Sequence, residues 1–146
     1  MSEHREPFHP QGVVVGDDGS ANAAAAVRFA AQEARLRGAT LHVVSAFSLL
    51  SANRPPDLPF GYVPSETELQ ESALATLTTR WADLEGDVEL HAVHGTPTKV
   101  LVEASASADL VVVGARGMGG FEAMILGSVA DQVMHHAQCP VVLVKA

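Results

Sequence analysis

The sequence contains a single cysteine, Cys139, so no disulfide can form within the chain and a reducing compartment is expected. Its apolar runs all fall short of the ~20 residues that a membrane-spanning helix needs. Basic residues are also scarce, since 9 Lys and Arg stand against 17 Asp and Glu, and the formal net charge is −8. This deficit of positive charge argues against binding to nucleic acid or to an anionic membrane surface.

The first twelve residues, MSEHREPFHPQG, lack the apolar core of a secretory signal peptide. We therefore expect a cytoplasmic protein. A chain of 146 residues is long enough for one hydrophobic core and too short for two. The sequence thus predicts a flexible N-terminal lead at 1–11, followed by one domain at 12–146.

Short valine-rich runs alternate with longer segments of helical period. The runs show little polar alternation, which is typical of parallel strands covered on both faces. These expected strands lie at 12–16, 39–47, 88–93, 109–114 and 139–146. Between them, helices are expected at 20–37, 65–84, 96–108 and 128–138. The alternation predicts an α/β fold with an open parallel sheet and helices on both faces.

Polar residues mark the expected beginnings of the helices. The predicted N-terminal caps are Ser20, Ser65, Thr96 and Ser128, and the second and fourth have an acidic residue three positions later, as in a capping box. One connection, residues 48–64, is unusually long and rich in proline. Because it follows a strand, it emerges at the carboxyl edge of the sheet, where it could close over a ligand as a lid.

The most glycine-rich stretch, GARGMGGFEAMILGS at 114–128, follows the fourth expected strand. Bare backbone allows N–H groups to approach an anion, and a helix beginning after Gly127 favours phosphate at its N-terminus. The segment has no lysine and so is not a Walker P-loop, and its spacing is not that of the dinucleotide fingerprint. Glycine content alone leaves phosphate binding and a tight turn as equal interpretations.

The spacing Gly114-x2-Gly117-x9-Gly127-Ser128 resembles the nucleotide-binding signature of the universal stress protein family. Three further segments resemble characteristic parts of that family in its order: VVVGDDGS, GTPTKVLVEASASADLVVVGARGMGG and LGSVADQVMHHAQCPVVLVKA. The resemblance covers about residues 12 to 146. It implies a Rossmann-like sheet of five strands in the order 3-2-1-4-5.

The resemblance also implies a nucleotide site, with ATP and Mg²⁺ as the expected ligands. Asp18 would reach the ribose or nearby phosphates, and the backbone of Ala46 would contact adenine. Two glycine-rich groups would hold the phosphates: Gly114, Arg116 and Gly117 in the loop, and Gly127, Ser128 and Val129 at the helix start. For Asp17 two interpretations stay open: a second carboxylate that helps to hold Mg²⁺, or a solvated side chain.

Most of these residues also have a purely structural interpretation. Asp18 could cap the following helix, Arg116 could be a solvated surface charge, and Ser128 could only cap its own helix. The histidines do not predict a metal site. His135 and His136 diverge on a helix, whereas His91 and His94 are expected at the surface.

The last expected strand, 140–145, is an apolar edge of the sheet, and self-pairing would cover it, so we expect a homodimer. No nucleophile with a base and no pair of catalytic carboxylates is recognisable, so slow ATP hydrolysis is the most we expect in catalysis. The sequence therefore predicts a nucleotide-dependent stress-response regulator with an unidentified protein partner. Two alternatives stay open: a phosphoryl- or adenylyl-transfer enzyme of the same fold class, and an interaction module that binds no nucleotide.

Overall fold

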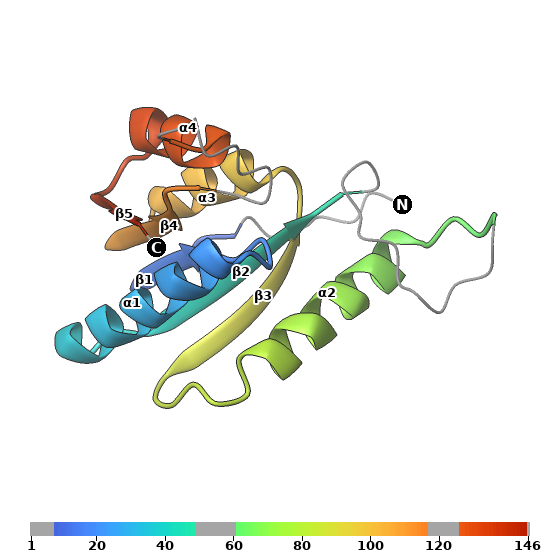
Figure 1. The fold of residues 1–146 in the computed structure, drawn as a ribbon, viewed down its shortest axis with the longest axis horizontal. Helices are drawn as coiled ribbons and strands as arrows, with labels where there is room; N and C mark the ends of the chain where they lie inside the picture. The colour runs from blue at the N-terminus through green and yellow to red at the C-terminus, as the bar shows by residue number, and fades with distance from the viewer. Residues whose placement is uncertain (1–7, 49–60, 117–125, 146) are drawn as a thin grey trace.

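The computed structural model describes residues 8–48, 61–116 and 126–145. Its five strands pair in parallel in the order β3-β2-β1-β4-β5, which confirms the predicted fold class and strand order (Figure 1). The strands are β1 (Val13–Gly16), β2 (Leu41–Phe47), β3 (Val88–His94), β4 (Leu110–Gly114) and β5 (Val141–Val144). The helices are α1 (Ala21–Arg37), α2 (Glu66–Arg80), α3 (Pro97–Ser105) and α4 (Ser128–His136).

Each face of the sheet carries its own core. Val13, Val14 and Val15 are all fully buried, because successive side chains of a strand point to opposite faces and helices cover both. The first and third of these valines pack with α1 and with Leu77 and Trp81 of the α2 region. Val14 packs with α3 and α4 on the other face. None of the four helices in the described residues is long and apolar enough to span a bilayer.

Side-chain caps explain where three of the helices begin. Ser20, Ser65 and Thr96 each accept a hydrogen bond from the backbone N–H three residues later, as predicted. The prediction for α4 was wrong. Its N-cap is Gly127, no side chain among the described residues caps it, and Ser128 is already its first helical residue.

Some predicted element ends and surroundings also differ from the structure. α2 ends at Arg80 rather than at residue 84, and α4 ends at His136 rather than at 138. His91, expected at the surface, is half-buried, and its ring centroid lies 5.1 Å from that of His42. The reason is that β2 and β3 pair along their full length, so side chains on the same face of the two strands touch.

The segment before β1 runs across the amino edge of the sheet. The Ser107 hydroxyl donates to the Pro10 carbonyl at 2.6 Å, and the Gly12 N–H donates to the Asp109 carboxylate at 3.1 Å. Residues 8–11 of the predicted lead therefore contact the domain. Residues 1–7, most of the predicted lid at 48–64, and Gly117 lie outside the described residues.

Candidate functional site

The carboxyl ends of β1 and β4 lie side by side in the middle of the sheet. The chain leaves β1 toward α1 and β2 on one side and leaves β4 toward α4 and β5 on the other (Figure 1). The winding direction therefore reverses between these two strands, which is where open parallel sheets bind their ligands. Asp18 and Arg116 follow the two strands directly, and both side chains are exposed.

Asp17 and Asp18 are neighbours with different surroundings. The Asp17 side chain is 1% exposed, and its Oδ2 accepts from Trp81 Nε1 at 2.7 Å and from Arg80 Nε at 2.9 Å. Its Oδ1 accepts from the Gly19 N–H at 3.0 Å. Asp17 is therefore neither solvated nor free to hold Mg²⁺, because both oxygens are engaged by protein donors.

Asp18 presents its carboxylate to solvent at the same edge. One oxygen, Oδ1, accepts from the Ser20 N–H at 2.9 Å and so supports the turn into α1. Ser20, rather than Asp18, is the N-cap of that helix. Gly19, between Asp18 and Ser20, has φ of 86°, a left-handed conformation that favours glycine. This conformation allows the chain to turn from β1 into α1.

Asn22, which sequence reasoning missed, ties α1 to the two strands beyond it. Its Oδ1 accepts from the Arg116 N–H at 2.5 Å, and its Nδ2 donates to the Val144 carbonyl at 3.1 Å. A Cβ added to Gly114 would lie 2.8 Å from the same Oδ1. Gly114 is thus required for the close approach of α1, whatever it does for a ligand. Nothing in the sequence around Asn22 indicates contacts with residues 94 and 122 positions away.

The N-terminus of α4 begins beside the end of β4. The Gly127 N–H donates to the Ala115 carbonyl at 2.6 Å, which brings the start of the helix to the strand's carboxyl end. Ser128 is exposed and Val129 is half-buried. Because no side chain in the described part of the chain caps α4, the N–H groups of its first turn and the positive end of its dipole are available to an anion.

Ala46 lies on β2 at the same edge. Gly16, the last residue of β1, pairs with Val44 of β2. Ala46 lies two residues beyond Val44, just as Asp18 lies two residues beyond Gly16, so the two residues are level with each other at this edge. Seven of the eight predicted site residues therefore fall at one edge of the sheet, on four segments of chain: the turn after β1, the end of β2, the end of β4 and the start of α4. The eighth, Gly117, lies outside the described residues.

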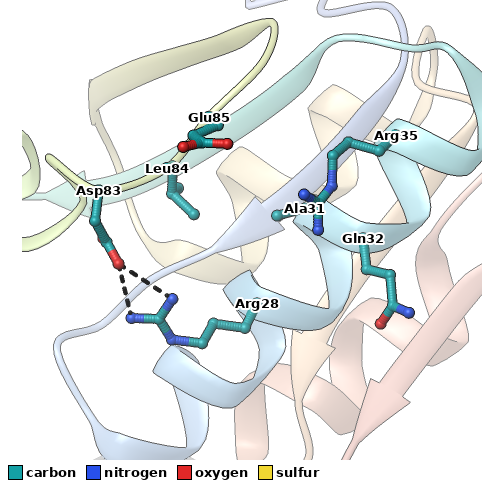
Figure 2. A pocket seen from close by; sticks show the side chains of 7 residues that line it. All are labelled: Arg28, Ala31, Gln32, Arg35, Asp83, Leu84 and Glu85. Carbon is teal, nitrogen blue, oxygen red and sulfur yellow. Dashed lines mark hydrogen bonds and ion pairs between the residues drawn. The ribbon is translucent and has the colours of Figure 1, made fainter.

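A separate pocket of about 290 Å³ lies between α1 and the segment that follows α2 (Figure 2). Its charged lining is mixed, with Arg28 and Arg35 against Asp83 and Glu85, and Arg28 pairs with Asp83 at 3.4 Å. The pocket adjoins the last turns of α1, away from the carboxyl ends of the strands. It gathers none of the predicted site residues.

The sequence model of the Universal stress protein family matches residues 11–145. Universal stress protein Rv2005c of Mycobacterium tuberculosis is 40% identical over 142 residues, which cover 96% of this chain and 47% of that protein. Universal stress protein Rv1996 of the same species is 38% identical over 97% of this chain and 45% of its own length. The chain thus spans about half the length of the curated relatives it matches.

Solved structures agree with the fold. A crystal structure of a universal stress protein in complex with cAMP has a TM-score of 0.65 at 30% identity and covers 92% of this chain and 96% of its own. A universal stress protein from Archaeoglobus fulgidus in complex with dAMP has a TM-score of 0.60 at 27% identity and covers 96% of this chain and all of its own. On its sequence, its strand order and these relatives, the chain belongs to the universal stress protein family.

Proposed function

We propose that this protein binds ATP with Mg²⁺ at the carboxyl edge of β1 and β4 and acts as a nucleotide-dependent regulator. The observation that carries the proposal is the meeting at this edge of an exposed carboxylate, the backbone that leaves β4 from Gly114 to Arg116, and a helix N-terminus that no described side chain caps. The carboxylate of Asp18 suits a ribose hydroxyl or a metal ion. The backbone around Arg116 and the first turn of α4 suit phosphates.

The related structures support an adenine nucleotide as the ligand class. One contains cAMP and another contains dAMP, and both are more than 25% identical to this chain. The second anion-binding element, at Gly127 and Ser128, favours a ligand with several phosphates over a monophosphate. The match of the family to 11–145 supports residues 12–146 as one domain.

The residues at the edge fit a magnesium ion held mainly by the nucleotide. Mg²⁺ prefers oxygen ligands and usually keeps several waters while binding one or two carboxylates and the phosphates of a substrate. Asp18 can supply such a carboxylate, whereas Asp17 is occupied by Arg80 and Trp81. The ion would neutralise phosphate charge next to an acidic side chain.

We favour a regulator over an enzyme because no described residue at this edge forms a nucleophile–base pair. Asp17 is engaged and buried, and Asp18 is exposed beside backbone N–H groups. An ordered water near Asp18 and Arg116 would be enough for slow ATP hydrolysis. The proposal includes a homodimer formed by β5, which is an edge of the sheet.

Amide chemical shifts test the location of the site. On addition of ATP and Mg²⁺ to the ¹⁵N-labelled protein, the amides of Asp18, Arg116 and Ser128 should shift, and those of Arg28 and Leu84 in the pocket of Figure 2 should not. Shifts confined to that pocket would place the nucleotide elsewhere. The absence of any shift from the apo protein would favour the interaction module without nucleotide.

A further inference from the structure

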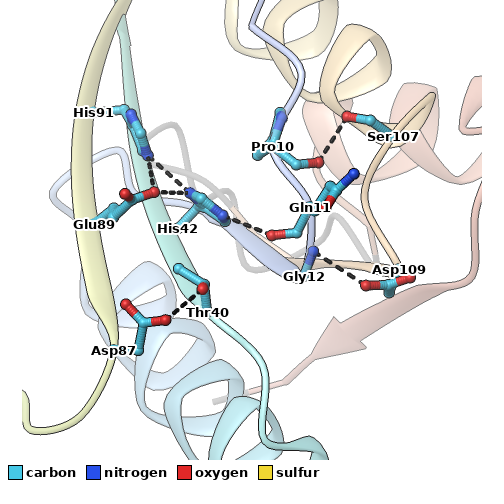
Figure 3. Close-up of polar contacts among 10 residues, drawn as sticks. All are labelled: Pro10, Gln11, Gly12, Thr40, His42, Asp87, Glu89, His91, Ser107 and Asp109. Carbon is cyan, nitrogen blue, oxygen red and sulfur yellow. Dashed lines mark hydrogen bonds and ion pairs between the residues drawn. The ribbon is translucent and has the colours of Figure 1, made fainter.

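Three side chains with metal-ligating atoms converge on the surface shared by β2 and β3 (Figure 3). His42 Nδ1 lies 2.9 Å from His91 Nε2 and 3.1 Å from Glu89 Oε2. The third side of the triangle, from His91 Nε2 to Glu89 Oε2, measures 3.8 Å. Tetrahedral zinc, with bonds of about 2.0–2.1 Å to nitrogen and oxygen, holds its ligand atoms about 3.3 Å apart.

The strand register produces this convergence. His42 pairs with Glu89, and Val44, two residues along β2, pairs with His91. Side chains two residues apart share a face of a strand, so all three groups point to one face. That face is the one covered by α3 and α4, and α3 lies over β1, β2 and β4. Over β3 the Phe8 ring packs beside His91, with ring centroids 4.8 Å apart, while Glu89 stays exposed.

The backbone before β1 sets the orientation of the His42 ring. His42 Nε2 lies 2.7 Å from the Gln11 carbonyl oxygen, so this nitrogen must carry the proton that is donated to it. In the neutral ring the lone pair is therefore on Nδ1, directed at His91 and Glu89. The Gln11 carbonyl is held between two anchored residues, Pro10 and Gly12 (Figure 3). A carbonyl partner of this kind is the usual orienting contact for a metal-bound histidine.

The cluster brings two electron-pair donors together. The His42 Nδ1 lone pair and the Glu89 carboxylate are both acceptors when the ring is neutral, and they lie 3.1 Å apart. A cation between them, or a shared proton, would remove the repulsion. Burial lowers the pKa of His91, and the nearby His42 lowers it further, whereas Glu89 opposes both.

Exposure leaves room for a further ligand. The His42 side chain is 7% exposed, that of His91 27% and that of Glu89 57%, so the cluster is closed beneath and open to water above. Two imidazoles and one carboxylate suit zinc better than magnesium or calcium, which prefer oxygen ligands alone. A water molecule would complete four-coordination.

We propose that His42 Nδ1, His91 Nε2 and the Glu89 carboxylate form a zinc-binding site. It is distinct from the nucleotide site, because it lies on β2 and β3 toward their amino ends, whereas the nucleotide site follows β1 and β4. Zinc bound here joins β2 to β3 and, through the His42–Gln11 contact, to the segment that enters β1. Zinc therefore stabilises the edge of the sheet and raises the Tm of the protein.

Zinc titration of the untagged, chelator-treated protein tests the site. The expected result is one zinc per chain by calorimetry, with affinity reduced at least ~10-fold in Glu89→Gln and further in His91→Gln. Glu89→Gln keeps the size of an exposed side chain, so loss of folding would not explain its effect. His94→Gln, which changes an exposed histidine of the same strand, serves as the matched control and should bind zinc as the wild type does.

A long-range ¹H–¹⁵N spectrum of the imidazoles gives a second readout. Zinc should shift His42 Nδ1 and His91 Nε2 and leave the His42 Nε2 proton in place. Absence of saturable zinc binding, or binding that survives in His91→Gln, would overturn the proposal and leave a proton-sharing histidine pair. Nucleotide binding is measured separately on the same variants, so failure of the zinc site and failure of the proposed function are distinguishable.

Discussion

At the scale of single residues, Asp17 and Asp18 have separate tasks although they are adjacent. Asp17 holds the end of α2 against the turn after β1, because it accepts from Arg80 and Trp81 while Arg80 also donates to the Ser20 carbonyl at 2.8 Å. Asp18 faces solvent at the ligand edge. A buried carboxylate with three donors is structural, and an exposed one is available to a ligand.

Replacing each aspartate by alanine should separate the two roles. Asp17→Ala leaves Arg80 Nε and the buried Trp81 N–H without their acceptor, and we expect a loss of about 3 kcal/mol in the free energy of unfolding. Asp18→Ala should lower the free energy of unfolding by about 1 kcal/mol or less, because the Ser20 N–H that donates to Asp18 remains open to water. Urea unfolding measures both. Equal losses in the two variants would contradict this assignment.

Gly114→Ala tests the close approach of α1 to β4. The new Cβ would collide with the Asn22 side chain, so we expect about 1–3 kcal/mol of destabilisation by urea unfolding. In an Asn22→Ala background the same substitution should cost clearly less. An unchanged cost would show that the Asn22 backbone carbonyl, 3.2 Å from the added Cβ, rather than its side chain, requires this glycine.

The limit of sequence reasoning at this scale is separation along the chain. Ser20, Ser65 and Thr96 were predictable as caps because a cap bonds a residue three positions away. The partners of Asp17 are 63 and 64 residues away, and those of Asn22 are further still. The His42, Glu89 and His91 cluster was missed for the same reason, since it depends on the register of two strands.

At the scale of elements, α2 begins with a capping arrangement that includes a tyrosine. The Tyr62 hydroxyl donates to Glu68 Oε1 at 2.6 Å, and the Ser65 hydroxyl lies 3.2 Å from the same oxygen. The hydrogen bond from Tyr62 lowers the pKa of the Glu68 carboxyl below its usual value, and the contacts with Ser65 lower it further. The ionised carboxylate is thus the form that the folded helix end favours.

Tyr62→Phe should raise the pKa of Glu68 toward its ordinary value, measured by a carboxyl ¹³C NMR titration. Because the folded-state pKa is depressed, the contribution of this carboxylate to stability is present above the unfolded-state pKa. It is lost as pH falls through the folded-state pKa. Ser72→Ala, in the same helix, is a control that should leave the titration unchanged. A Glu68 titration that is the same in Tyr62→Phe and wild type would refute the contact.

The β5 edge carries the dimer prediction. Pro140 and Val144 direct their carbonyls to β4, so by alternation the N–H and carbonyl groups of Val141 and Leu143 face away from the sheet. A second copy could pair with these groups. Leu143→Pro removes one outward N–H without removing a bond to β4.

Light scattering at micromolar concentration should give a dimer for the wild type and for Leu143→Ala, and a monomer for Leu143→Pro. The alanine variant separates loss of the side chain from loss of the N–H. A monomeric wild type would contradict dimerisation through β5.

At the scale of the whole molecule, the fold was predictable because its signals are local and repeated. Valine triplets such as Val13–Val15 mark strands covered on both faces, and caps mark the helices between them. The order 3-2-1-4-5 came from the resemblance to the family, and the structure confirms it. The position of the proposed ligand site then follows from the strand order, whereas the hydrogen-bond partners of each residue at that edge depend on packing between distant segments.

Calorimetric titration of ATP and Mg²⁺ into the protein, after prebound ligand has been removed and identified, tests the central claim most directly. We predict saturable binding with micromolar affinity that is reduced at least ~10-fold, about 1.4 kcal/mol, in Asp18→Ala. Arg28→Ala, in the separate pocket, should bind as the wild type does. Absence of binding by the wild type, with no nucleotide released on denaturation, would contradict the account and move the search for function to the β5 surface.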